Sequence, residues 1–383
     1  MSGTTRTKLG FESLERKQML AGDVLVRVIG GHLIIEGDEA GNQIAISSGE
    51  EAGTYVIQGL DGTAVQMADA EPGDPPAPET GLVVEGVRGN VRVGLGEGDD
   101  TVIIHDARFR HNLTIGTGAG ADEVRIGAAS DASPEAALVE ADANVVVRGW
   151  LTVATGEEGD TVTVADASVG GVLSILTDGG DDTVNLGAEA AEGVAASAAG
   201  AGEDATLHAR WGIHVLLGNG VDELVARDVA TRGVLAIGGG AGADTIGVHD
   251  STATVLGIRG GEGDAGDVVE MSGVNAHHVA ISLGGGSDRA SIVDSAFGSL
   301  AVALGAGNDS LSIQTVRARR AILAGGEGDG DELSDAGDNT FGHVVISGFE
   351  LPPDVNTDPI LPRITRPGQL GGTIARLLAR LRR

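Results

Sequence analysis

Short runs of alternating apolar and polar residues recur along this chain, and glycine-rich turns separate them. The apolar positions of two such stretches are Val162, Val164, Val169, Leu173 and Ile175, and Ile246, Val248, Leu256 and Ile258. A two-residue period in short segments is typical of β-strands with one buried face, whereas helical segments repeat every three to four residues. The pattern therefore predicts an all-β protein in which these side chains point inward.

The strands belong to a sequence repeat that an aspartate marks in the pattern G-x-G-x-D-x-V. The marker residues are Asp100, Asp122, Asp160, Asp182, Asp222, Asp244, Asp267, Asp288, Asp309 and Asp331, with weaker copies at Asn42 and Thr63. Steps from Asp222 onward are 22, 23, 21, 21 and 22 residues, and two longer steps of 38 and 40 residues contain Ala-rich insertions. A third insertion contains the segment EPGDPPAPE.

One period cannot bury its own apolar face, so the periods must stack. We expect about twelve coils of about 22 residues in a parallel β-helix, right-handed by analogy with other coils of this size. The predicted solenoid spans residues 25–350. Because the insertions recur at one phase of the repeat, they should leave the rod on one side.

The charge balance narrows the range of partners. The 383 residues include 56 acidic and 25 basic side chains, which gives a formal net charge of −31. Such a charge argues against nucleic acid as a partner, and it favours divalent cations or plain solubility. The chain has no cysteine, so it forms neither disulfides nor thiolate metal sites. No apolar run of about 18 residues is present, and the sequence predicts no transmembrane span.

A second aspartate often follows the marker by six residues, at Asp106, Asp166, Asp228, Asp250 and Asp294. In a stack, equivalent carboxylates would lie about 4.8 Å apart in two rows, and their mutual repulsion would call for a neutralising partner such as Ca²⁺. The expected calcium ligands are Asp100, Asp122, Asp160, Asp182, Asp222, Asp244, Asp288 and Asp309, and secondarily the second row. The alternative is that each aspartate caps its turn by accepting hydrogen bonds from backbone N–H groups, without metal.

The marker resembles the calcium-binding RTX repeats, whose motif is close to GGxGxDxUx with U a large aliphatic residue. Gly239–Gly247 (GGAGADTIG) and Leu304–Ser312 (LGAGNDSLS) carry the resemblance. It implies a parallel β-helix with bound Ca²⁺. RTX repeats, however, follow one another about every nine residues, two to a coil. Here one marker occurs per coil, so half of each RTX-type site is missing from the sequence.

The N-terminal segment departs from the repeat. Leu9–Val24 (LGFESLERKQMLAGDV) resembles the LEPR-XLL signature found near the start of many large surface or secreted proteins of planctomycete bacteria. The resemblance implies export to the cell surface or the exterior. We assign residues 1–24 to this segment.

The C-terminal part also departs from the repeat. Residues 351–367 are rich in proline and predict a linker. Residues 368–383 predict a short basic amphipathic helix, whose apolar side is formed by Ile374, Leu377, Leu378 and Leu381. We expect this helix to dock on the acidic rod or to remain a flexible tail rather than to bind a membrane.

Motifs for catalysis are sparse. A phosphate-binding loop needs a lysine after its glycines, and a dinucleotide fingerprint lies between one strand and one helix, so neither fits glycines that recur in every coil. We interpret the histidines as solvent-facing turn residues: His32, His105, His111, His208, His214, His249, His277, His278 and His343. Trp150 and Trp211 each follow an insertion and are expected to cover the side of the rod beneath it. Exposed tryptophans would also suit stacking on a sugar ring.

These observations favour a non-enzymatic, extracellular or cell-surface β-helical module with a structural or adhesive role, and Ca²⁺ is its candidate cofactor. The expected partners are cell-surface or extracellular matrix components, glycans among them. The alternative is a β-helix that binds or cleaves polysaccharides, with its site on the side that carries the insertions and tryptophans.

Overall fold

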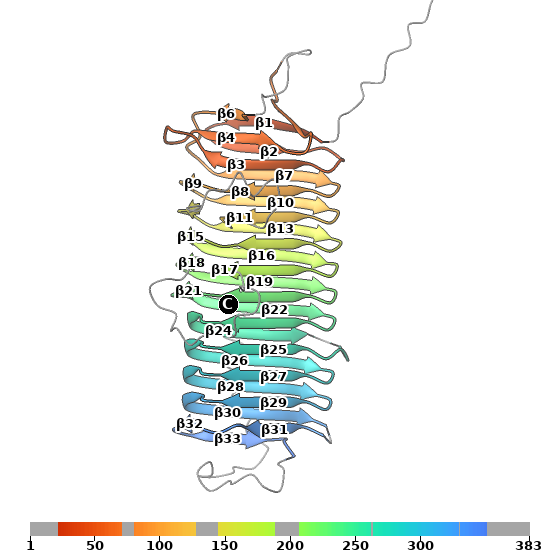
Figure 1. The fold of residues 1–383 in the computed structure, drawn as a ribbon, viewed down its shortest axis with the longest axis vertical. Coiled ribbons are helices and arrows are strands. Elements are labelled where there is room, and N and C mark those ends of the chain that lie inside the picture. Colours follow the sequence, from red (N-terminus) through yellow and green to blue (C-terminus); the bar gives the residue numbers. More distant parts are fainter. Residues whose placement is uncertain are drawn as a thin grey trace, which may run out of the picture.

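The computed structural model describes residues 22–70, 80–127, 145–187, 207–261, 263–328 and 330–350. Within these ranges the chain consists of strands and turns and contains no helix. The strands stack into a rod along which the chain advances in regular coils (Figure 1). The predicted all-β parallel solenoid with a period of about 22 residues is confirmed, as the 22-residue step between the paired Val91 and Leu113 illustrates. The hand of the coil stays a prediction.

Each coil contributes strands to two sheets, which we call sheet A and sheet B. The stacked strands of sheet B are β3 (Gln43–Ser48), β8 (Thr101–Ile104), β11 (Glu123–Ile126), β14 (Thr161–Val164), β17 (Thr183–Gly187), β20 (Glu223–Arg227), β23 (Thr245–His249), β25 (Val268–Ser272), β27 (Arg289–Val293), β29 (Ser310–Gln314) and β31 (Glu332–Asp335). The long strands of sheet A are β2 (His32–Glu36), β7 (Val91–Glu97), β10 (Leu113–Ala119), β13 (Leu151–Glu157), β16 (Val172–Gly179), β19 (Gly212–Asn219), β22 (Val234–Ala241) and β33 (Val344–Ser347).

Sheet A also contains a short strand ahead of the long strand in most coils. The short strands are β9 (Arg108–Phe109), β12 (Val145–Val147), β15 (Ala167–Val169), β18 (Leu207–Ala209), β21 (Val229–Thr231) and β32 (Thr340–Phe341). From β24 onward a single strand spans both parts, in β24 (Thr252–Gly261), β26 (Asn275–Gly285), β28 (Ala296–Ala306) and β30 (Arg317–Glu327).

Neighbouring coils pair in register, residue for residue. Leu113 of β10 pairs with Val91 of β7 on one side and with Leu151 of β13 on the other. Because side chains alternate between the two faces of a strand, this register aligns the inward side chains of successive coils in columns. The interior is therefore a set of aliphatic columns that run along the rod.

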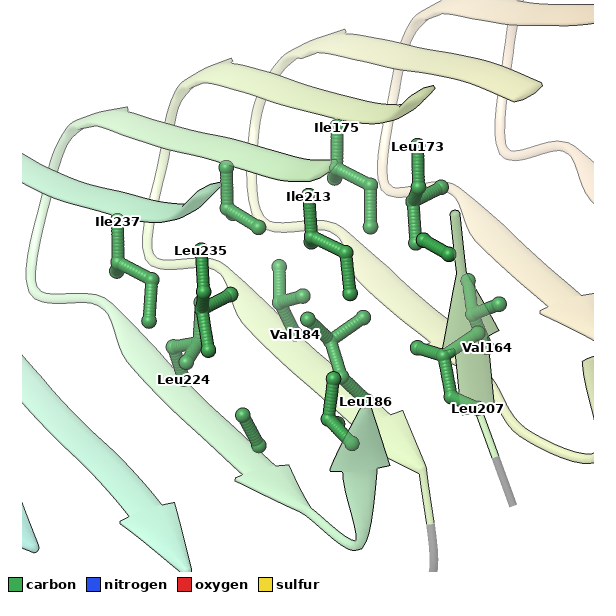
Figure 2. Close-up of a cluster of buried hydrophobic side chains, with 14 of the residues drawn as sticks. Val164, Leu173, Ile175, Val184, Leu186, Leu207, Ile213, Leu224, Leu235 and Ile237 are labelled. Atoms are coloured by element: carbon green, nitrogen blue, oxygen red, sulfur yellow. The ribbon is translucent and has the colours of Figure 1, made fainter. Parts of the chain in front are cut away.

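The predicted inward side chains are confirmed. Figure 2 shows Leu173 and Ile175 of β16 and Val184 and Leu186 of β17 among the buried side chains of neighbouring coils. All nine residues named from the alternation pattern are at most 2 % exposed, namely Val162, Val164, Val169, Leu173, Ile175, Ile246, Val248, Leu256 and Ile258. Full burial of one Val, Leu or Ile side chain contributes about 1.5–3 kcal/mol, so the columns are the main source of stability.

The N-terminal end is a cap built from antiparallel pairs. Its additional strands are β1 (Asp23–Ile29), β4 (Tyr55–Gly59), β5 (Ala64–Met67) and β6 (Leu82–Val84). β1 pairs antiparallel with β2, β4 pairs antiparallel with β3 and β6, and β5 lies parallel to β1. The Tyr55 ring stacks on Phe109 with centroids 5.3 Å apart, and its hydroxyl donates to the carbonyl of Arg108 (2.9 Å). The cap thus covers the sheet edges that the parallel stack would expose at this end.

Ten coils carry a marker aspartate, and the two weaker copies of the marker divide between the stack and the cap. Asn42 lies in the stack, where its backbone N–H donates to Oδ1 of Asp100 (2.7 Å). Thr63 lies in the cap, where its Oγ1 accepts a hydrogen bond from the N–H of Gln43 (2.8 Å). The described strands cover most of the predicted solenoid range, from Asp23 to Ser347.

Two insertions join the rod at the same place in the coil, as predicted, whereas the third joins it at a different place. Residues 128–144 separate β11 from β12, and residues 188–206 separate β17 from β18. Residues 71–79, in the third insertion, fall between β5 and β6 of the cap. The insertions lie outside the described residues, as do residues 1–21 of the signature segment and the whole of residues 351–383. In the described ranges no helix is long and apolar enough to cross a membrane.

Candidate functional site

The marker aspartates form one continuous row along the rod, in the turn before each sheet B strand. All ten residues from Asp100 to Asp331 are at most 2 % exposed. Asp267 and Asp331, which were not among the expected calcium ligands, occupy the same position as the other eight. We call this set the buried row.

Each carboxylate of the buried row accepts a hydrogen bond from the backbone of the preceding coil. The N–H of Asp182 donates to Oδ1 of Asp222 (2.9 Å), and the N–H of Asp222 donates to Oδ1 of Asp244 (3.1 Å). The same bond joins every consecutive pair at 2.7–3.1 Å. A buried N–H without a partner costs about 1–3 kcal/mol, so an acceptor is needed at this turn in every coil. The aspartate side chain supplies this acceptor, so the turn needs no additional residue.

Burial raises the pKa of most of the carboxyls from Asp100 to Asp309. The pKa of Asp100 is raised to about 7, because burial disfavours the charged form. Burial likewise raises the pKa values of Asp160, Asp222, Asp267 and Asp288 to about 6. Neighbouring carboxylates of the row add to the increase, while the hydrogen bond from the backbone N–H opposes it. These carboxyls therefore take up protons at a higher pH than an exposed aspartate does, and each proton bound lowers the repulsion along the row.

The buried row offers little space for a calcium ion. Ca²⁺ takes six to eight oxygen ligands at about 2.3–2.6 Å. Oδ1 is engaged by a backbone N–H, and Oδ2 is shielded from solvent; at Asp244 it packs against Gly239, where a β-carbon would collide with it. Among the described residues, no group of three or more Asp, Glu, His or Cys side chains gathers closely enough to hold a metal ion. The geometry favours turn capping, and calcium stays a prediction.

The second row of aspartates lies at the other end of the sheet B strands. Asp106, Asp166, Asp228, Asp250 and Asp294 all have a left-handed backbone, with φ between 42° and 53°. Two other coils place Gly273 and Thr315 here, also with positive φ. Left-handed conformations are disfavoured for most residues and are best tolerated by glycine, asparagine and aspartate. We call these five aspartates the corner row; the structure gives them a role in the backbone turn.

The outward side of sheet A carries no carboxylate over most of its width. From β7 to β33 its outward columns are Arg92, Thr114, Thr152, Ser174, His214, Ala236, Gly257, Ala280, Ala301, Ile322 and Val345, and Gly94, Gly116, Ala154, Leu176, Leu216, Gly238, Arg259, Ser282, Ala303, Ala324 and Ser347. The outward column of the short parts is Arg108, Val146, Ser168, His208, Ala230, Thr252, Asn275, Ala296, Arg317 and Thr340.

The junctions between the short and long parts are also free of carboxylates. They are residues 88–90, 110–112, 148–150, 170–171, 210–211, 232–233, 254, 277–278, 298–299, 319–320 and 342–343. Acidic side chains resume at the far ends of the long strands, for example at Glu97 and Glu157. We call the columns and junctions together the basic face; its junctions lie beside the short strands labelled β9, β15, β18 and β21 in Figure 1.

Most described arginines lie on this basic face, and none of those has an acidic partner in the described part of the chain. They are Arg88, Arg92, Arg108, Arg110, Arg148, Arg210, Arg232, Arg259, Arg317, Arg319 and Arg320. Elsewhere, Arg27 pairs with Glu36, Arg125 with Glu123 (2.6 Å) and Arg227 with Asp250 (3.6 Å). The arrangement places unpaired guanidinium groups on one side of a molecule whose formal net charge is −31.

The basic face is hollowed where it crosses β26, β28 and β30. A groove of about 740 Å³ is lined there by His277, His278, Arg319 and Arg320, with Ala301 and Leu300 among the residues at its base. His278, Ser299 and Arg320 pair in register, and His278 Nδ1 lies 2.8 Å from Ser299 Oγ. We call this hollow the basic groove.

No family model, curated protein or solved structure matches this chain. The interpretation of the buried row, the corner row and the basic face therefore rests on their own geometry. The RTX and LEPR-XLL resemblances rest on the residues that carry them.

Both tryptophans lie at junctions of the basic face and are exposed, Trp150 by 61 % and Trp211 by 66 %. The coil between them has glycine at this junction, and a side chain on Gly171 would collide with the Trp150 ring. Trp150 therefore covers the surface of the next coil, and the guanidinium of Arg210 lies 6.0 Å from the centre of the Trp211 ring. The prediction also placed each tryptophan beneath an insertion, and the insertions lie outside the described residues.

The histidines are not all solvent-facing turn residues. His105 and His249 are half-buried, and burial lowers the pKa of His249, whose Nδ1 lies 2.8 Å from Ser272 Oγ. His208 and His214 are exposed but lie on strands of the basic face. Sequence reasoning missed this face, although Arg-Gly directly before a long strand at Arg88, Arg148 and Arg232 is a signal for it.

Proposed function

We propose that this protein is a non-enzymatic structural and adhesion module of the cell surface or extracellular space, a rigid acidic rod that attaches to polyanionic components through its basic face. The observation that carries the proposal is the segregation of charge. Of the four described arginines outside the basic face, three have acidic partners, namely Arg27, Arg125 and Arg227. The basic face keeps its guanidinium groups unpaired among the described residues, which leaves them available to an external anion.

The interior of the rod supports a structural role. Successive coils are joined by the ladders of two sheets, by aliphatic columns and by the hydrogen bonds of the buried row. Such a stack holds groups on distant coils at fixed separations, which is what a spacer or an adhesive surface requires. The LEPR-XLL resemblance of Leu9–Val24 supports export, and calcium is retained as a candidate ligand of the aspartate rows.

The test is retention of the full chain on immobilised acidic polysaccharide, compared with a neutral polysaccharide gel. We expect salt-dependent retention on the acidic gel only. A variant with R148Q, R210Q and R232Q should elute at lower salt, because each arginine contributes a charge-assisted contact. Equal retention of this variant on the acidic gel would contradict the proposal.

A polysaccharide-cleaving β-helix is the second candidate, and the basic groove favours it. The groove contains two arginines and two histidines but no carboxylate among its described lining residues. Hydrolysis by a pair of carboxylates therefore has no support there. Elimination with formation of an unsaturated sugar is the reaction to assay, by absorbance after overnight incubation with acidic polysaccharides. Turnover that survives buffer exchange would contradict the non-enzymatic proposal.

A further inference from the structure

The basic groove is larger than a second hollow on the basic face, which has a volume of about 230 Å³ and is lined by Leu176, His214, Leu216 and Arg259 among others. In the basic groove Ala301 is only 8 % exposed, although it occupies an outward position of sheet A. The side chains of the junction residues form one wall of the recess. A ligand in the groove would therefore contact an apolar floor and a cationic wall at the same time.

The wall consists of two arginines and two histidines, which belong to two coils that flank a third. His277 and His278 belong to β26, and Arg319 and Arg320 belong to β30. Two strand spacings, about 9.6 Å, separate these coils. Ser299 lies between them, and its contact with Nδ1 of His278 fixes that ring and leaves Nε2 for a ligand. The wall thus offers two separated anion contacts with a hydroxyl between them.

The coil spacing matches the dimensions of a glycan. A pyranose ring in an extended chain advances by about the same length as one coil, roughly 5 Å. A glycan along the rod axis would therefore place about one sugar ring on each coil. Alternate rings would bring their acidic groups to Arg320 and His278, and the apolar faces of the rings would lie on the floor at Ala301.

The basic C-terminal segment does not complement the groove in charge. Residues 359–383 contain six arginines and no acidic residue, so their charge resembles that of the groove. An external anion fits the charge of the groove better than this segment.

We infer that the basic groove binds an extended anionic polysaccharide, with its carboxylate or sulfate groups on Arg319, Arg320 and the His277–His278 pair. This inference rests on the proposed adhesion through the basic face and names its ligand class and its principal subsite. Arginine suits this role because its planar guanidinium donates two parallel hydrogen bonds to a carboxylate or sulfate. Stacking on Trp150 and Trp211 extends the contact along the same junctions.

The experiment is titration calorimetry of the full chain with four probes: oligogalacturonate, sulfated dextran, neutral dextran and poly-glutamate. We expect binding of oligogalacturonate or sulfated dextran, and whichever binds identifies the acidic group. The double variant R319Q/R320Q should weaken this binding at least tenfold. R27Q/R289Q removes the same charge at sites outside the basic face and should change binding less than threefold. A301W fills the groove without altering charge and should weaken binding as strongly as R319Q/R320Q.

The outcomes separate this inference from the proposed function. If the wild type binds acidic glycans but R319Q/R320Q and A301W bind equally well, the groove assignment is wrong while adhesion through the basic face stands. If R27Q/R289Q weakens binding as much as R319Q/R320Q, net charge rather than the groove is responsible. Binding of poly-glutamate as tight as that of the glycans would replace the polysaccharide with an acidic protein. Melting curves of each variant verify that the rod is intact.

Discussion

Two rows of aspartates with one spacing in the sequence have different physical roles in the fold. In the buried row the side chain matters, because Oδ1 of residues such as Asp222 accepts a backbone hydrogen bond from the preceding coil. In the corner row the backbone matters, because residues such as Asp228 have positive φ, as Gly273 has at the equivalent position of another coil. The same residue type at a fixed interval is therefore not evidence for one shared ligand.

The largest expected effect is on the pH dependence of stability, since it sums over the buried row. The folded pKa values of about 6 to 7 lie above the unfolded value of about 3.9, so the folded chain binds more protons between these limits. This contribution to stability should be complete at or below about pH 4 and should be lost as the pH rises to about 7. Melting temperatures across this interval and up to about pH 8 measure it.

Two controls separate the buried row from the general acidity of the surface. Salt near 0.5 M screens repulsion between exposed charges but has little effect on buried groups, so the decline with pH should persist. The variant D222N/D288N removes two titrating groups and should flatten the decline. If stability no longer declines with pH in 0.5 M salt, or if D222N/D288N shows the same decline as the wild type, the decline is caused by surface charge instead.

The next effect is the loss of one hydrogen bond of the buried row. D222A leaves the buried N–H of Asp182 without its acceptor and should lower the free energy of unfolding by about 1–3 kcal/mol. D222N keeps an acceptor oxygen, as Asn42 shows an amide residue can occupy this row, and should be near neutral at pH 5 and stabilising at pH 8. Urea unfolding of both variants checks the order. Equal losses in D222A and D222N would mean that the negative charge, not the acceptor, is required.

Substitutions in the corner row should reduce stability less than those in the buried row. The order of alanine and glycine variants by stability should also differ between the two rows. Alanine has a β-carbon, which is unfavourable in a left-handed turn, so D228A should lower the free energy of unfolding by about 1 kcal/mol. Glycine lacks the β-carbon, so D228G should lower it less than D228A does. In the buried row, by contrast, D222G should be no better than D222A, because both lack the acceptor. Urea midpoints of these four variants test whether the two rows differ as described. A shared rank order would remove the distinction between them.

The sequence allowed the coil to be predicted because two-residue alternation and a constant period determine which side chains face inward. Val162 and Ile246 follow from that rule alone. The same rule did not predict the antiparallel cap, because apolar and polar residues alternate along β1 and β2 in the same way as along the coil strands. The Gly30-Gly31 pair between them, with φ of 60° and 84°, is a hairpin signal that the repeat alignment does not use.

The candidate site was less predictable than the coil. The marker aspartates were correctly placed in one row, but a spacing cannot show whether Oδ1 of Asp222 meets a metal or an N–H group. The basic face depends on register: Arg148, Arg210 and Arg320 are distant in sequence, and only the pairing of their strands aligns their junctions. The groove depends further on the recess at Ala301, which no local pattern encodes.

The smallest expected effect is that of metal removal, and it completes the comparison of the two rows. Oδ1 of each buried aspartate already accepts a hydrogen bond from an N–H group, and Oδ2 of nine of the ten is shielded from solvent, so chelation should leave the melting temperature of the rod unchanged within about 1 °C. Melts with excess chelator and with millimolar Ca²⁺ test this. If Ca²⁺ raises the melting temperature of the wild type and of D228N but not of D222N, the ion binds to the buried row. If Ca²⁺ fails to raise the melting temperature only in D228N, the ion binds to the corner row, where the carboxylates are more open to solvent.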